Sequence, residues 1–276
     1  MESNMRETDR NYDSRWWALV YDQWNETGGR SGRHHCELDF YRNQLRGTSG
    51  AVLEGACGTG SILLPLLADG LDMYGFDAAE PMLEVLARKA VAAGIGDADV
   101  RITRQDLVDF AYDRLFEAII IPASSIMMLT TQQGQISCLQ DVYAHLHPGG
   151  RLLLNFYVPS YPEDLLLHQD ALSTEDELGT FTHPDTGRPI QVCHAKVCDF
   201  ASQTETYTWI FRHGDETASV PMQARWIHTE EFRLLLRLAG FARWELYGSH
   251  ALAPYVGSAR MTDAYWVATK EVQKPA

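Results

Sequence analysis

The sequence predicts an α/β fold in which a doubly wound, mostly parallel sheet with an antiparallel last strand carries an inserted antiparallel β subdomain. Strand-like apolar segments alternate with helical segments over residues 50–157, which is typical of a parallel sheet covered by helices on both faces. Residues 158–226 lose this alternation and, from 191 onward, become rich in Val, Thr, Ile, Trp and Phe. The helix–strand pattern returns over 227–276, so we expect the sheet to resume behind the insertion.

Residues 1–49 precede the first predicted strand, and we expect them to form a helical lid. Tyr12, Trp16 and Trp17 fall at helical spacing, and the pattern continues to Trp24. A second helix is expected over residues 34–45. The aromatic side chains fit either ordinary packing or a lid that closes over a ligand and excludes water.

The first predicted strand runs directly into a glycine-rich turn. Residues 52–60 read VLEGACGTG, and a helix is expected over 61–68. Gly55, Gly58 and Gly60 have no Cβ, so a ligand can approach the backbone closely. The spacing G-x-x-G-x-G differs from the dinucleotide fingerprint G-x-G-x-x-G, which argues against a nicotinamide oxidoreductase. The turn predicts a ligand site at the end of this strand.

Two carboxylates follow the next two predicted strands. Asp77 ends the second strand about 20 residues beyond the glycines, where a carboxylate can accept hydrogen bonds from a ribose diol. Its alternative is a plain N-cap for the following helix. Asp106 follows the third strand and is either a ligand acceptor or an exposed turn acid.

The remaining elements are predicted from hydrophobic periodicity and from breaks at Gly and Pro. The apolar run 118–121 is typical of a strand buried on both faces. Residues 158–188 read as irregular. The expected strands are 71–76, 100–103, 118–121, 151–156, 191–201, 204–212, 218–226, 241–247 and 264–270, and the expected helices are 81–93, 136–146 and 229–240.

Four segments together resemble class I S-adenosylmethionine-dependent methyltransferases, which have a Rossmann-like fold. They are Val52–Gly60, Asp77 with Pro81-Met82-Leu83, Gln105-Asp106-Leu107, and Leu146–Gly150. The resemblance covers roughly residues 50–157 and extends more loosely to 229–241. The Tyr21-Asp22 region and the β-rich insertion are similar to small-molecule tailoring methyltransferases of natural-product pathways, several of which act on amino sugars or other amines.

The resemblance implies S-adenosyl-L-methionine as cofactor. Glu54 would lie near the methionine ammonium, or act only as a helix-dipole partner; Asp77 would take the ribose, and Asp106 the adenine amino group. Ile126, like Met82, could cover the adenine or simply belong to the core. The implied cofactor-binding residues are Tyr21, Arg30, Glu54, Gly55, Ala56, Gly58, Gly60, Asp77, Ala78, Met82, Gln105, Asp106, Leu107, Pro122 and Ser124.

The chemistry of methyl transfer favours an amine acceptor. The thioether leaves as a neutral group, so neither an oxyanion hole nor a metal is required, and alignment supplies most of the acceleration. A hydroxyl acceptor usually needs a base. Some amine-methylating relatives place a His after the fourth strand, where this chain has Met127 and Met128. Candidate catalytic residues are Tyr12, Tyr21, Tyr157 and His168.

We therefore expect methyl transfer to an amine nitrogen of a small molecule, driven mainly by proximity and orientation. The alternatives are O- or C-methylation of a small natural product, and a methyltransferase-like fold that uses the cofactor as a scaffold without transfer.

Composition limits the classes of partner. Lys and Arg number 23 against 37 Asp and Glu, a formal charge of -14, which argues against nucleic acid. The polar start does not read as a signal peptide, and no apolar run is long enough to span a bilayer. Five irregularly spaced cysteines suggest neither disulfides nor a zinc site. We expect a cytoplasmic protein without a membrane partner, and a homo-oligomer stays open.

Overall fold

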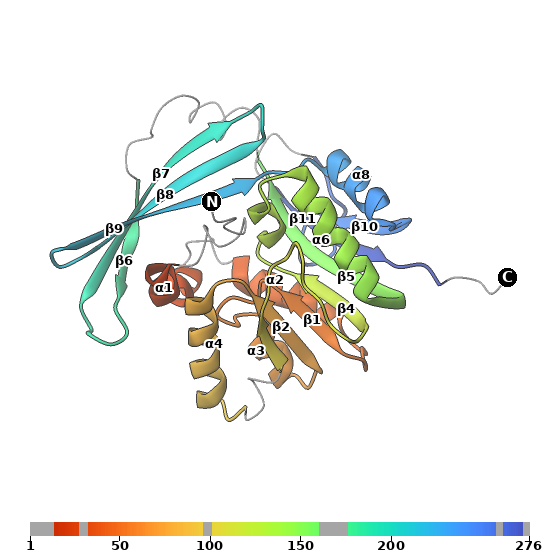
Figure 1. The fold of residues 1–276 in the computed structure, drawn as a ribbon, viewed down its shortest axis with the longest axis horizontal. Helices are drawn as coiled ribbons and strands as arrows, with labels where there is room; N and C mark the ends of the chain where they lie inside the picture. Colours follow the sequence, from red (N-terminus) through yellow and green to blue (C-terminus); the bar gives the residue numbers. More distant parts are fainter. Residues whose placement is uncertain (1–13, 28–32, 96–100, 160–175, 258–261, 273–276) are drawn as a thin grey trace, which may run out of the picture.

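The computed structural model describes residues 14–27, 33–95, 101–159, 176–257 and 262–272. These residues form a seven-stranded sheet of order β10-β11-β5-β4-β1-β2-β3 and a four-stranded sheet of order β6-β7-β8-β9 (Figure 1). The large sheet consists of β1 Val52–Gly55, β2 Met73–Asp77, β3 Ile102–Arg104, β4 Phe116–Ile121, β5 Leu146–Val158, β10 Arg243–Tyr247 and β11 Thr262–Thr269.

The first five strands of the large sheet are parallel, whereas β11 is antiparallel to both β5 and β10. The predicted fold class is therefore confirmed, including the antiparallel hairpin at the sheet edge. The isoleucines at 119–121 are 0 to 1% exposed, because helices cover both faces of this central strand. The helices are α1 Arg15–Glu26, α2 Arg33–Gln44, α3 Leu63–Ala68, α4 Glu80–Ala92, α6 Gln132–His145 and α8 Thr229–Ala239, with a short 3₁₀ helix η2 Ser125–Met128.

Each face of the large sheet has its own apolar core. One core gathers side chains of α6 and α8, and the other gathers side chains of α2, α3 and α4. Helix α8 shows why: Phe232, Leu235, Leu236 and Ala239 are buried and fall at i, i+3, i+4 and i+7, which forms one apolar stripe. Gly240 ends the helix with a φ of 106°.

The small sheet consists of β6 Asp176–Thr182, β7 Pro189–Asp199, β8 Thr204–His213 and β9 Glu216–Arg225, all antiparallel. It extends away from the large sheet and lies over α1 (Figure 1). Trp17 of α1 packs edge-on against Trp209 and Phe211 of β8, with ring centroids 4.4 and 5.6 Å apart. Most of the aromatic stripe of α1 therefore packs on the small sheet, as the packing interpretation expected.

Strand β6 was not predicted, since residues 158–188 were read as irregular. Its sequence, DELGTFT, has weak strand propensity. It forms because it pairs with β7, and the register of this pairing shifts between Glu177 and Gly179. Strand β5 also begins at Leu146, earlier than the strand expected over 151–156, and its pairing with β4 shifts register between Phe116 and Ala118. Pairing between strands decided both outcomes.

Among the described residues, no helix is both long and apolar enough to cross a membrane.

Candidate active site

A cavity with about 690 Å³ of empty space, partly open to solvent, lies at the carboxyl ends of the parallel strands. Ligands of open α/β sheets bind at this edge. The cavity is lined by Tyr21, Ala56, Gly58, Phe76, Asp77, Ala78, Ala79, Met82, Gln105, Leu107, Ala123, Ser125 and Met128.

A second cavity of about 370 Å³ adjoins the first and shares Tyr21, Ala56, Gly58 and Ala123 with it. The two cavities therefore form one elongated cleft, which we call the strand-end cleft. The second cavity is further lined by Asn25, Glu37, Glu54, Cys57, Ser61, Ile62 and Pro122.

Asp77 is held rigidly at the centre of the strand-end cleft. Its Oδ2 accepts a hydrogen bond from Gly58 N, and its Oδ1 accepts one from Ala79 N, both at 2.8 Å. Burial raises the pKa of Asp77, and these backbone donors oppose that shift. The N-cap of α4 is Ala79, so the alternative of Asp77 as a plain N-cap is wrong. Each carboxylate oxygen keeps a lone pair for a ligand hydroxyl.

Two buried carboxylates line the second cavity. Glu54 is 2% exposed, and its Oε2 has no hydrogen-bond partner among the described residues. Burial, and then the charge of Asp77, raise its pKa well above the usual range. Glu37 of α2 is also buried, and Asn155 Nδ2 donates to its Oε1 at 2.9 Å. Tyr41 OH donates to Asn155 Oδ1 at 2.6 Å. A cationic ligand group would compensate both acids.

Glu37 and Asn155 were not predicted from the sequence. Asn155 lies in the apolar end of β5, directly after three leucines, and a lone polar residue there was the available signal. Helix α2 mixes buried and exposed residues, so Glu37 gave no such signal. Only the tertiary fold brings the two side chains together.

The three glycines of the turn have different structural roles. Gly58 has a φ of 52° and lines the cleft, and among the described residues a Cβ there would meet only Asp77 Oδ2, at 4.0 Å. A Cβ on Gly55 would come within 3.0 Å of Leu107 Cδ2 and 3.1 Å of Phe76 Cζ. A Cβ on Gly60 would come within 2.9 Å of a buried leucine. Gly58 alone of the three lines the cleft, and the other two allow close packing.

Several predicted site residues lie beside the cleft and do not line it. Asp106 is 1% exposed, so it is not an exposed turn acid; its Oδ1 accepts a hydrogen bond from Val108 N at 3.1 Å. Ser124 is buried, and Tyr157 is half-buried in β5. Ile126 belongs to the core. The predicted residues Tyr12, Arg30 and His168 lie outside the described residues.

The backbone of the cleft wall is strained. Ala56, Ala123 and Ser124 have φ values of 55°, 60° and 62°, in the left-handed region that costs a non-glycine residue about 1–3 kcal/mol. Ala56 and Ala123 line both cavities, and Ser124 is the N-cap of η2. Neighbouring structure must therefore hold these turns in place.

Comparison with known proteins agrees with this geometry. Residues 52–150 match the family model of a methyltransferase domain. The chain is 28% identical over 209 residues to a cypemycin N-terminal methyltransferase from Streptomyces sp., covering 76% of this chain and 79% of that protein.

Solved structures share the fold. The CcbJ methyltransferase from Streptomyces caelestis superimposes with a TM-score of 0.70 at 21% identity, covering 96% of this chain and 100% of that chain. The sugar N-methyltransferase KedS8 from Streptoalloteichus sp. gives a TM-score of 0.67 at 18% identity, covering 91% and 93% of the two chains.

The donor set fits S-adenosyl-L-methionine. This molecule carries a ribose diol and an amino-acid ammonium, and the cleft offers hydrogen-bond acceptors to both: Asp77 in the first cavity, and the unsatisfied Glu54 oxygen beside Glu37 in the second. The domain match, the curated relatives and the fold all agree with that fit. Residues 52–150 match a methyltransferase domain, the chain is an S-adenosylmethionine-dependent methyltransferase, and S-adenosyl-L-methionine is its cofactor.

Proposed function

We propose that this enzyme transfers a methyl group to an amine nitrogen of a small natural product. The observation that carries the proposal is the chemistry of the junction between the two cavities, because the sulfonium would lie there, between the ribose and the amino-acid end. Among the described residues that line both cavities, only Tyr21 has a titratable side chain. An amine that reaches the cavity in its neutral form needs no strong base, whereas a hydroxyl does.

The wall beyond Asp77 consists of small and apolar groups. Ala123, Ser125 and Met128 follow β4, and Met128 stands where some amine-methylating relatives place a His. Bound in the cleft, the cofactor would supply a methyl carbon on a cationic sulfur. A neutral amine nitrogen would bond to this carbon as the C–S bond breaks and the neutral thioether leaves, and the resulting ammonium would lose one proton to solvent. These residues then act by excluding water and by orienting the acceptor.

Two known proteins support the amine as acceptor class. The curated relative is named an N-terminal methyltransferase, and the KedS8 structure is that of a sugar N-methyltransferase. Their names describe those proteins, and we extend the type of acceptor atom to this chain as a proposal.

We assign a role to each residue from its place in the strand-end cleft. We assign the ribose to Asp77, the adenine to Met82, Gln105 and Leu107, and the amino-acid end to Glu54 and Glu37. We assign residues 1–49 as a lid over the cleft and the small sheet, within residues 158–226, as the surface that chooses the acceptor. Tyr21 lines both cavities, so it is our candidate for contact with both cofactor and acceptor.

The test is incubation with methyl-labelled cofactor and a panel of amino sugars, peptides with free amino termini, other amines and phenols. Mass spectrometry of the products should place the label on nitrogen. Label found only on oxygen or carbon would refute the amine proposal. Cofactor binding without transfer to any acceptor would favour the scaffold alternative. The Asp77→Ala variant is the control and should lose transfer to every acceptor.

A further inference from the structure

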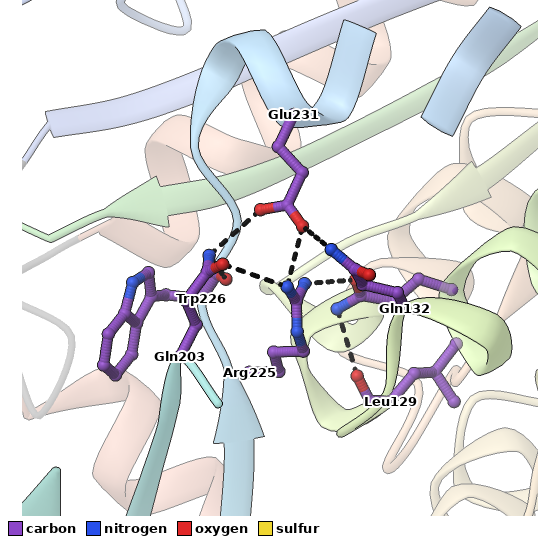
Figure 2. A network of polar contacts seen from close by, with 7 residues as sticks. Leu129, Gln132, Gln203, Arg225, Trp226 and Glu231 are labelled. Carbon is purple, nitrogen blue, oxygen red and sulfur yellow. Dashed lines mark hydrogen bonds and ion pairs between the residues drawn. The ribbon is translucent and has the colours of Figure 1, made fainter. Parts of the chain in front are cut away.

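A polar network centred on a buried arginine joins the base of the small sheet to the core (Figure 2). Its centre is Arg225, the last residue of β9, which is 4% exposed. Nη1 donates to Gln135 Oε1 of α6 at 2.9 Å. Nη2 donates to Glu231 Oε1 of α8 at 2.7 Å and to Gln203 Oε1, between β7 and β8, at 3.1 Å. One guanidinium thus ties together the small sheet and two helices of the core.

The network continues to the wall of the strand-end cleft. Gln135 is 0% exposed, and its Nε2 donates to the carbonyl oxygen of Leu129 at 3.0 Å. Leu129 is the C-cap of η2, and η2 contains Ser125 and Met128, which line the cleft. Gln135 is therefore a bridge, because its amide bonds Arg225 with one atom and the end of η2 with the other.

The electrostatics of the network favour a fixed geometry. Gln132 Nε2 and Gln203 Nε2 donate to the two Glu231 oxygens at 2.7 and 3.0 Å. Burial acts to raise the pKa of Glu231, but these donors and the charge of Arg225 outweigh it and lower the pKa. The carboxylate stays ionised against Arg225. Lysine could keep this ion pair but could not reproduce the fork of donors that reaches three partners.

The segment that the network holds is one that needs support. Ala123 and Ser124, directly before η2, both have left-handed φ values, and β9 packs against η2. A strained segment persists only where surrounding structure determines it. Ser125 and Met128 of η2 line the first cavity, so a ligand there would contact the segment that the network holds.

We propose that Arg225 is a positioning residue that couples the small sheet to the cleft wall, so that cofactor in the cleft and the base of the small sheet order one another. Coupling between two sites is reciprocal in binding free energy. The sheet that we assign to the acceptor would thereby improve cofactor binding, and cofactor would prepare the sheet. Only this last statement rests on the proposed function; the coupling itself does not require an acceptor.

The test is hydrogen–deuterium exchange of the full chain with and without S-adenosylhomocysteine. In the wild type, this probe should slow exchange in peptides covering 122–130 and also in peptides covering 203–205 and 222–226. Arg225→Lys keeps the positive charge but removes the planar set of N–H donors that reaches three partners. Gln135→Met keeps the side-chain volume but removes the hydrogen bonds of Gln135 to Arg225 and to the carbonyl oxygen of Leu129. The measured quantity is the ratio of the exchange rate without the probe to the rate with it. In both variants, this ratio should fall by about fivefold or more for peptides covering 222–226, whereas it should stay at the wild-type value for peptides covering 122–130.

Arg233→Lys is the matched control, because Arg233 pairs with Glu230 on the exposed face of α8. It should behave as wild type. A purely structural role for Arg225 would speed exchange equally with and without the probe, leaving the ratio unchanged, and that result would overturn the proposal. So would a wild type in which the probe leaves 222–226 unaffected. If Arg225→Lys does not fold, Gln135→Met decides. Absence of methylated product would refute the acceptor proposal and leave these outcomes untouched.

Discussion

Replacing Asp77 with asparagine removes a charge from the centre of the strand-end cleft and keeps the size of the side chain. The carboxylate now accepts from Gly58 N and Ala79 N, each at 2.8 Å. The amide of asparagine has only one oxygen. If its NH₂ group faces Gly58 N or Ala79 N, that backbone donor loses its acceptor; if its NH₂ group faces the ligand, the ligand hydroxyl loses its acceptor.

The expected effect on cofactor binding follows from the lost bond. A hydrogen bond to a charged group contributes about 1.5–3 kcal/mol. Since about 1.4 kcal/mol corresponds to a tenfold change, Asp77→Asn should weaken S-adenosylhomocysteine binding by about 10- to 150-fold. Isothermal titration calorimetry measures this directly.

Asp72→Asn is the matched control at the other end of the same strand. Asp72 pairs with Arg101 at 3.0 Å, and its side chain is 39% exposed, so the pair contributes only about 0–1 kcal/mol. This variant should bind the probe as wild type does. If Asp77→Asn also bound within about twofold of wild type, well short of the loss of one charged hydrogen bond, the assignment of Asp77 to the ligand would be refuted.

Four further variants address the glycine turn and the acidic end of the cleft. Gly55→Ala should destabilise the fold by about 1–3 kcal/mol in urea unfolding through overpacking, whereas Gly58→Ala should also weaken S-adenosylhomocysteine; equal stability of Gly55→Ala and wild type would contradict this. Glu37→Gln should weaken S-adenosylhomocysteine about tenfold or more but not 5′-methylthioadenosine, which lacks the amino-acid group; calorimetry showing equal losses would exclude contact with that group. Because burial raises the pKa of Glu54 in the folded state, the folded state holds its proton to higher pH than the unfolded state, so the free energy of unfolding should fall as pH rises above about 4.3 and through the folded pKa; urea unfolding across this range should lose that contribution in Glu54→Gln, and an unchanged slope would argue against it.

Sequence patterns predicted most of the core fold because local periodicity and burial coincide there. The run at 118–121 could only be a strand covered on both faces, and it is the centre of the large sheet. The helix expected over 229–240 is α8, which buries one side of its surface. Strand β6 escaped prediction because its pairing with β7, and not its own residues, makes it a strand.

The same division applies to the cleft. Gly58, Asp77 and Leu107 were predictable as lining residues because each lies at or shortly after the end of a strand, and parallel strands bring their carboxyl ends to one edge. Asp106 shares that position, but its side chain caps a buried turn. Adjacent positions in a loop look alike in sequence, and only the path of the backbone decides which side chain reaches the cavity.

The sequence by itself determined the strand–helix order, the glycine turn and the acid that follows the second strand, because these depend on spacing along the chain. Tertiary structure alone decided that Glu37 lies beside Glu54, that Ser125 replaces Ser124 at the cleft wall, and that Arg225 reaches Gln135. Those contacts join segments up to 90 residues apart, and their energies come from burial and geometry that no local pattern records.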